Sequence, residues 1–115
     1  MDERAPFLPL SPAVLHILLA LAPEDRHGYA IMQEVARLTN GQYKLGPGTL
    51  YDNLQKLMSQ GLVDEVPRTA EDDPRRRYYH LNSFGRRVLS ADVDRLQAVV
   101  HQARQYLEIT EPGRA

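Results

Sequence analysis

The 115-residue sequence contains no cysteine and no tryptophan, only two phenylalanines, and no apolar run long enough to span a bilayer. Without cysteine the chain cannot form a disulfide scaffold, a thiolate metal site or a cysteine nucleophile. The longest apolar run, Ala13–Ala22, is interrupted by His16, and no basic segment of the kind found in signal peptides precedes it. We therefore expect a cytoplasmic protein that does not enter a membrane.

The chain also lacks an excess of charge of one sign. Its 14 Lys and Arg residues oppose 15 Asp and Glu residues, which gives a formal net charge of −1. This balance excludes a histone-like polycation and confines any basic surface to a local patch. Hydrophobic residues make up 43% of the chain and charged residues 25%, so the composition predicts one small globular domain.

Patterns typical of catalytic and metal sites are absent as well. The histidines lie far apart in the sequence, at His16, His27, His80 and His101. None has metal-ligand spacing to another histidine or to a carboxylate. The segment Gly46–Thr49 lacks the Gly-Lys-Ser/Thr of a phosphate loop, and no serine lies in a nucleophile elbow. We expect no enzymatic activity, no cofactor and no metal.

Capping residues and apolar periodicity predict four helices and a hairpin. The first helix begins after Ser11, a good N-cap that Pro12 follows, and ends before Pro23. Helical spacing of apolar residues predicts helices over about 28–38 and 47–60, with stops at Asn40-Gly41 and Gly61. Strand-like runs at 62–66 and 77–81 flank a charged loop, and a last helix extends from 83 to about 108.

This order of elements predicts a mainly α chain with a small β-hairpin, as a winged helix-turn-helix followed by a long C-terminal dimerisation helix. The expected parts are an N-terminal arm (1–9), the winged helix-turn-helix (10–82), the dimerisation helix (83–108) and a flexible tail (109–115). Apolar residues at 4-3-4-3-4 spacing form a coiled-coil seam on the last helix. The expected dimerisation residues are Leu89, Val93, Leu96, Val100, Ala103 and Leu107.

The third predicted helix has a polar face opposite its leucines, where bases and phosphates could form hydrogen bonds. The candidate residues on this face are Gly48, Thr49, Tyr51, Asp52, Asn53 and Lys56. Lys56 lies four residues after Asp52, within reach of an ion pair. An ordinary solvated helix face would have the same composition.

The predicted loop contributes three guanidinium groups, from Arg75, Arg76 and Arg77, at the position where a wing grips phosphates. Strand alternation places Arg76 on the side opposite to the other two arginines. The arginines could instead neutralise the acidic residues beside them.

Three more residues extend the candidate DNA contact. Lys44 precedes the third helix, and Gly28 is expected to expose backbone N–H groups to a phosphate at the start of the second. Tyr29 offers a hydroxyl, although packing in the core is an equally good explanation for this side chain.

Five segments together resemble the PadR family of transcriptional regulators. They are Leu10-Ser11-Pro12, His27-Gly28-Tyr29-Ala30-Ile31, Leu45-Gly46-Pro47-Gly48-Thr49-Leu50-Tyr51, Gly61-Leu62-Val63 and Arg75-Arg76-Arg77-Tyr78-Tyr79-His80-Leu81. The similarity covers about residues 10–90 without gaps. It implies a homodimeric winged-helix repressor of the compact branch, in which one C-terminal helix mediates dimerisation.

Two features depart from the family pattern. Asp52 follows Tyr51 where family members often have a basic or small residue, and its carboxylate is unfavourable beside a phosphate but can accept from cytosine N4. Tyr106 is the only aromatic residue far along the last helix, which disfavours a stacked drug site between two such helices.

We therefore expect a sequence-specific repressor that binds double-stranded DNA at a palindromic operator as a homodimer. A small-molecule effector of unknown identity would relieve the repression. Two alternatives remain, a winged-helix module that binds another protein and a small-molecule sensor with weak DNA binding. A steep salt dependence of binding would favour DNA over a mostly apolar protein partner.

Overall fold

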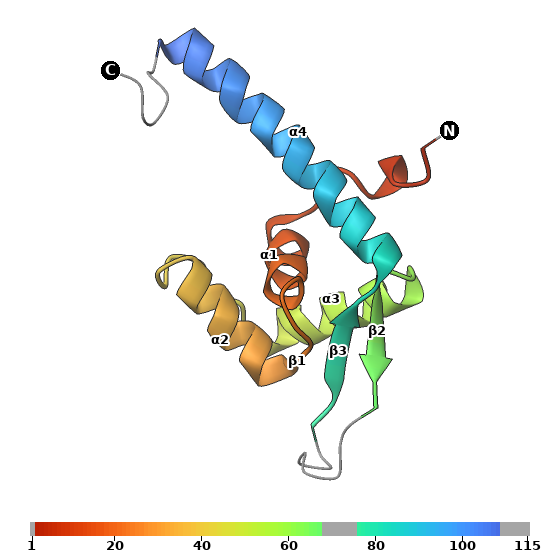
Figure 1. Ribbon diagram of the computed structural model, residues 1–115. Coiled ribbons are helices and arrows are strands. Elements are labelled where there is room, and N and C mark those ends of the chain that lie inside the picture. The colour runs from red at the N-terminus through yellow and green to blue at the C-terminus, as the bar shows by residue number, and fades with distance from the viewer. Residues whose placement is uncertain (1, 68–75, 109–115) are drawn as a thin grey trace.

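The computed structural model describes residues 2–67 and 76–108 and confirms the predicted winged helix-turn-helix with its long last helix (Figure 1). A short 3₁₀ helix, η1, precedes the larger elements. The helices are α1 (Pro12–Leu21), α2 (Gly28–Leu38), α3 (Pro47–Ser59) and α4 (Ser83–Leu107), and the strands are β1 (Arg26–His27), β2 (Val63–Val66) and β3 (Tyr78–Leu81). The segment 68–75, which includes Arg75, and the predicted tail 109–115 lie outside the described residues.

α1 lies at the centre of the core because it is apolar on nearly every side. Its N-terminus forms as predicted, since the Ser11 hydroxyl accepts a hydrogen bond from the Val14 N–H at 3.2 Å and Pro12 occupies the first helical position. The helix packs against α2, α3, α4 and β3. Its most deeply buried residues are Ile17, Leu18, Ala20 and Leu21.

Two arginines from other elements complete the C-terminal end of α1. Arg26 of β1 donates to the carbonyl of Ala20, and Arg86 of α4 donates to the carbonyl of Ala22, each at 2.7 Å. Carbonyls in the last turn of a helix have no partner within that helix. These two bonds therefore link the central helix to the sheet and to α4.

The sheet has the strand order β1-β3-β2, with both pairings antiparallel. The predicted hairpin is confirmed as β2 and β3, with Val63 opposite Leu81 and Val66 opposite Tyr78. The sequence did not predict β1, whose residues Arg26 and His27 lie opposite Tyr79 and Tyr78. β1 leads directly into α2, so the sheet fixes the start of that helix beside β3.

α4 begins against the winged domain and then extends away from it (Figure 1). The side chain of Asn82 caps the helix by accepting from the Gly85 N–H at 2.8 Å. A Cβ on Gly85 would lie 2.1 Å from the Leu62 carbonyl oxygen, so glycine allows α4 to approach the β2 end of the hairpin. The buried carboxylate of Asp92 accepts from Arg95 at 2.7 Å.

The predicted N-terminal arm packs on the first turns of α4. Phe7 meets Phe84 edge to face, with 5.7 Å between the ring centroids. Glu3 forms an ion pair with Arg87 at 2.9 Å. The arm thus covers the part of α4 that belongs to the winged domain.

Candidate nucleic-acid interface

α3 presents the polar face that its periodicity predicted. Gly46 is the N-cap and Pro47 the first helical residue, and the apolar stripe of Leu50, Leu54 and Leu57 is buried. On the opposite side the exposed candidates are Gly48, Thr49, Tyr51, Asp52 and Lys56. A helix held by one apolar stripe leaves this face available to a groove of DNA.

Local contacts distinguish the polar side chains on this face. Asn53 is half-buried, and its amide donates to the Thr49 carbonyl at 2.8 Å, so part of its hydrogen-bonding capacity is used within α3. Within the described part of the chain, Asp52 and Lys56 form no ion pair. Both side chains are exposed, and the Asp52 carboxylate therefore adds an uncompensated negative charge to α3.

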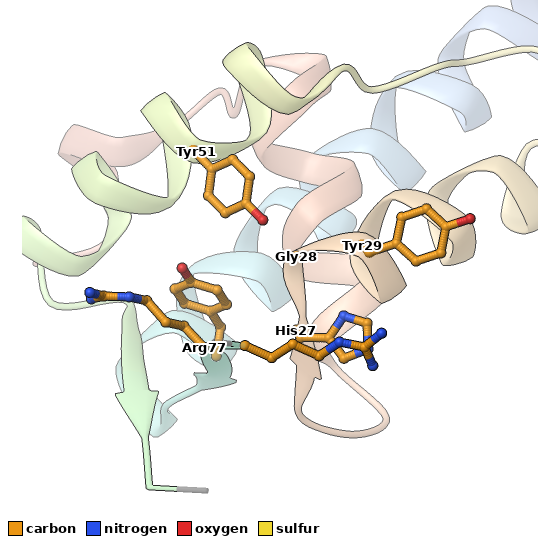
Figure 2. Close-up of a pocket in the computed structure, with 7 residues that line it drawn as sticks. His27, Gly28, Tyr29, Tyr51 and Arg77 are labelled. Atoms are coloured by element: carbon orange, nitrogen blue, oxygen red, sulfur yellow. The ribbon is translucent and has the colours of Figure 1, made fainter. Parts of the chain in front are cut away.

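A cavity of about 370 Å³ lies beside this helix, between the start of α2 and the residues that lead into β3 (Figure 2). It joins candidates that are far apart in the sequence. The described residues that line it are His27, Gly28, Tyr29, Tyr51, Arg76, Arg77 and Tyr79. Figure 2 shows the Tyr51 ring reaching from α3 toward Gly28, whereas the Tyr29 hydroxyl points away from Tyr51.

Gly28 is buried beneath Tyr51, in contrast to the expectation that it exposes backbone N–H groups. A Cβ at Gly28 would lie 2.2 Å from the Tyr51 hydroxyl oxygen and 2.7 Å from the ring carbon that bears it. The residue is therefore required for the close approach of α3 to α2. Tyr51 itself remains 48% exposed.

Arg76 and Arg77 directly precede β3, which begins at Tyr78, and both line this cavity. The guanidinium of Arg77 pairs with Glu65 of β2 at 3.2 Å. A nitrogen of the Arg76 guanidinium lies 3.1 Å from Nε2 of His27.

Tyr79 lines the cavity although the sequence did not indicate it, and the candidates Tyr29 and Lys44 remain to be placed. Burial raises the pKa of the Tyr79 hydroxyl above its ordinary value. Tyr29 is exposed, which disfavours the explanation that it packs in the core. Lys44 is exposed in the loop before α3 and does not line the cavity.

Sequence analysis did not select His27 as a site residue. Its side chain caps α2, because Nδ1 accepts from the Ala30 N–H at 3.1 Å. The available signal was its position directly before the predicted first residue of that helix. Histidine is not among the residues usually preferred as N-caps.

The predicted dimerisation seam divides into two parts on α4. Leu89 is only 6% exposed, because it packs in the core of its own chain, and Leu96 is half-buried. Val93, Val100 and Leu107 are 42%, 50% and 68% exposed, which is high for large apolar side chains. Ala103 is exposed too, and Val99 and Tyr106 beside the seam add further apolar surface.

Within residues 2–67 and 76–108, no group of three or more His, Asp or Glu side chains could hold a metal ion. None of the helices in these ranges has the length and apolar character needed to cross a bilayer.

Known proteins share this fold and parts of this sequence. The chain is 35% identical over 88 residues to the transcriptional regulator Rv3488 of Mycobacterium tuberculosis, a match that covers 76% of this chain and 78% of that protein. Among solved structures, a PadR family transcription regulator from Clostridium difficile R20291 superposes with a TM-score of 0.71 at 22% identity, over 84% of this chain and 99% of that one. RosR of H. salinarum superposes with a TM-score of 0.61 at 30% identity, over 84% and 79%.

The family profile described as "Transcriptional regulator PadR-like family" matches residues 14–91, which include most of α1, the residues that line the cavity and the first turns of α4. This match spans more than half of the chain and agrees with the resemblance inferred from its motifs. The polar face of α3 and the arginines of the hairpin suit a regulator that binds DNA. The chain belongs to the PadR-like family of DNA-binding transcriptional regulators.

Proposed function

We propose that this protein is a repressor that binds a palindromic operator as a homodimer. The observation that carries the proposal is the cavity in which Tyr51 of α3, the start of α2 and two arginines of the hairpin come together beside the exposed face of α3. Hydrogen-bond donors from three separate elements thus face the place where a DNA backbone would run if α3 entered the major groove.

Each part of the site has a distinct role in this proposal. The exposed residues in the first half of α3, Thr49 and Asp52 among them, read base edges. Arg76, Arg77 and Arg75 of the same loop neutralise phosphates. Gly48, Asn53 and Lys56 on α3, together with Tyr29 of α2 and Lys44, contact the backbone beside the groove.

The two-fold symmetry proposed for the operator rests on pairing of α4 with the α4 of a second copy. Its seam from Val93 to Leu107 exposes apolar side chains on a helix that extends beyond the winged domain. Pairing with a second copy removes this surface from water and places two α3 helices on two half-sites.

Repression, relief by an effector and a cytoplasmic location complete the proposal. They rest on the family resemblance and the composition of the chain. The proposed role is regulatory and requires no catalysis, cofactor or metal.

Selection of DNA from a random pool by the purified protein at moderate salt tests the proposal. We expect an enriched palindrome, bound with a steep inverse dependence of affinity on salt concentration. A matched selection with Tyr51→Ala should give weaker enrichment. Enrichment of no sequence, together with binding that is insensitive to salt, would favour a protein-interaction module.

A further inference from the structure

Tyr79 contributes a nearly buried side chain to the cavity. It is only 3% exposed and nevertheless lines the cavity. Along β3 the alternation of the strand buries Tyr79 and Leu81 and leaves His80 exposed. β3 is the central strand, and Tyr79 lies opposite Arg26 of β1 and Glu65 of β2. The sheet therefore holds this side chain in place from both sides.

The hydroxyl of Tyr79 has no hydrogen-bond partner among the described residues, whereas buried tyrosine hydroxyls usually find one. Its electrostatic neighbours indicate where it lies. Burial raises the pKa of Tyr79 most, Tyr51 and Glu65 raise it further, and Arg77 lowers it. Tyr51 and Arg77 both line the cavity. The hydroxyl thus faces the cavity, and its partner must come from there.

The surroundings of this hydroxyl suit an anionic acceptor. Among the described residues that line the cavity, Arg76 and Arg77 are basic and none is acidic. Glu65 pairs with Arg77 at 3.2 Å and does not line the cavity. The volume of about 370 Å³ is many times the ~30 Å³ that one water molecule occupies in the liquid, which leaves room for a phosphate group. A tyrosine hydroxyl is protonated at neutral pH and can donate to it.

DNA binding changes which partners the hydroxyl can have. In the free protein, water in the cavity can accept its hydrogen bond. A DNA backbone that covers the cavity displaces this water, and the hydroxyl is then left unpaired at a cost unless the DNA supplies an acceptor. The backbone carries anionic phosphate oxygens, which are stronger acceptors than neutral groups.

We propose that the hydroxyl of Tyr79 donates a hydrogen bond to a phosphate group of the DNA backbone that enters this cavity. The identification of that phosphate as part of DNA rests on the proposed function. Tyr51 offers its hydroxyl from α3 and Tyr79 offers its own from β3. Helix and sheet thus contact the same stretch of backbone.

Tyr79→Phe isolates the hydroxyl, because it keeps the ring in the core. Tyr78→Phe is the matched control. Tyr78 is the preceding residue of the same strand, packs edge to face on His27 with 5.4 Å between the ring centroids, and does not line the cavity. Since the hydroxyl of Tyr79 has no partner among the described residues, its loss should not lower the melting temperature.

Affinity for a mixed-sequence DNA duplex is measured for these variants over a range of salt concentrations. We expect Tyr79→Phe to weaken binding by about 10- to 100-fold, the range for a lost hydrogen bond to a charged group. The salt slope should not change, because a neutral donor releases no counterion. Tyr78→Phe should bind as wild type does.

The sign of the effect distinguishes the two possible fates of the hydroxyl. If DNA removes the water without supplying an acceptor, Tyr79→Phe escapes that cost and binds as tightly as wild type or more tightly. Such a result overturns the phosphate contact while the proposed function stands. A loss of affinity that accompanies a lower melting temperature, or that is equally large in Tyr78→Phe, overturns the contact as well.

A second measurement uses inorganic phosphate and needs no DNA. Carbon NMR of protein labelled at the tyrosine ζ carbons reports on each hydroxyl, and the signal absent from Tyr79→Phe belongs to Tyr79. We expect phosphate to shift this signal and sodium chloride at equal ionic strength to leave it unchanged. If wild type binds no duplex yet shows this shift, the site stands and takes a free phosphate group, and the proposed function fails. A Tyr79 signal that neither phosphate nor duplex moves overturns the site.

Discussion

The absence of a side chain at Gly28 determines where the Tyr51 ring can lie. A Cβ there would meet the hydroxyl end of Tyr51 at 2.2 Å, and the backbone of Gly28 does not need a positive φ. In Gly28→Ala the ring of Tyr51 must swing away, while alanine is the better helix former. We expect weaker DNA binding, by about tenfold for the loss of one hydrogen bond from the Tyr51 hydroxyl to DNA, with a melting temperature equal to wild type or slightly higher.

Fluorescence anisotropy with a duplex and calorimetric unfolding measure both quantities. Gly46→Ala at the N-cap of α3 is the control for adding a methyl group, since a Cβ at Gly46 meets no atom within 4 Å. If Gly28→Ala binds DNA as tightly as wild type, the position of Tyr51 is irrelevant to binding.

Asp52 places a carboxylate on the face of α3 that is proposed to read bases, and Lys56 does not neutralise it. Repulsion by phosphates should weaken binding to every sequence, and a cytosine N4 donor should offset this at one base pair. We expect Asp52→Asn to raise affinity for random DNA and to lower discrimination at one operator position by about 1–3 kcal/mol.

Binding to a panel of single-base operator variants checks this expectation. Asp94→Asn removes an equal charge from α4 and should leave the base preference unchanged. Equal gains for Asp52→Asn on operator and random DNA, without a change in preference, would show that Asp52 reads no base.

At the scale of elements, Glu34 joins α2 to β1. Hydrogen bonding from Arg37, helped by the charge of Arg26 at 3.2 Å, lowers the pKa of Glu34 below its ordinary value of 4.5. A group whose pKa is lower in the folded state contributes stability above its unfolded pKa and loses it as the pH falls through the folded pKa.

Glu34→Gln should therefore unfold at lower urea concentration than wild type at pH 7, and the gap between the two midpoints should be smaller at pH 3. Urea titration at both pH values tests this. Glu24→Gln is the control, because its side chain is far more exposed in its pair with Arg26. A gap between the midpoints that is as large at pH 3 as at pH 7 would contradict an ionic contribution of Glu34.

The hairpin acts as a wing if its arginines hold phosphates. Changing Arg75, Arg76 and Arg77 together to alanine should weaken binding to all sequences about equally. The slope of log K against log salt should flatten by about one unit per lost contact per protomer. Arg77 must exchange Glu65 for a phosphate, so its share of the loss should be the smaller one. Unchanged operator affinity in the triple variant would remove the wing from the mechanism.

Elements set by local chemistry could be predicted from the sequence. α2 extends from Gly28 to Leu38 as its periodicity predicted, and α1 begins at the Ser11 cap. β1 could not be predicted, because two residues show no alternation and pair only with β3, far along the chain. The contact of His27 with Arg76 joins residues separated by 49 positions, and the burial of Gly28 depends on Tyr51. These features arise from tertiary packing.

At the scale of the whole molecule, α4 makes the chain elongated. The radius of gyration is 16.2 Å and the longest extent is 54 Å, whereas a compact domain of about 100 residues has a radius of about 13 Å. The extension consists of a helix that exposes valines and leucine along the seam, and this surface is left in water in a single chain. An isolated helix of this kind gains little stability of its own, because helices in proteins depend on packing of their apolar face. A second copy of α4 would supply that packing.

A substitution at Val100 tests the proposed pairing of two α4 helices, because this residue lies in the middle of the exposed seam and is 50% exposed in one chain. Val100→Asp places two carboxylates against each other in a dimer, and burying unpaired charges is costly. We expect monomers in sedimentation, with the winged domain still folded. DNA affinity should fall strongly, because two half-sites can no longer be bound together. Ala98→Asp adds the same charge on the outer face of α4 and should remain dimeric. A wild-type protein that sediments as a monomer at micromolar concentration would contradict the proposed homodimer, and a dimeric Val100→Asp would place its interface elsewhere.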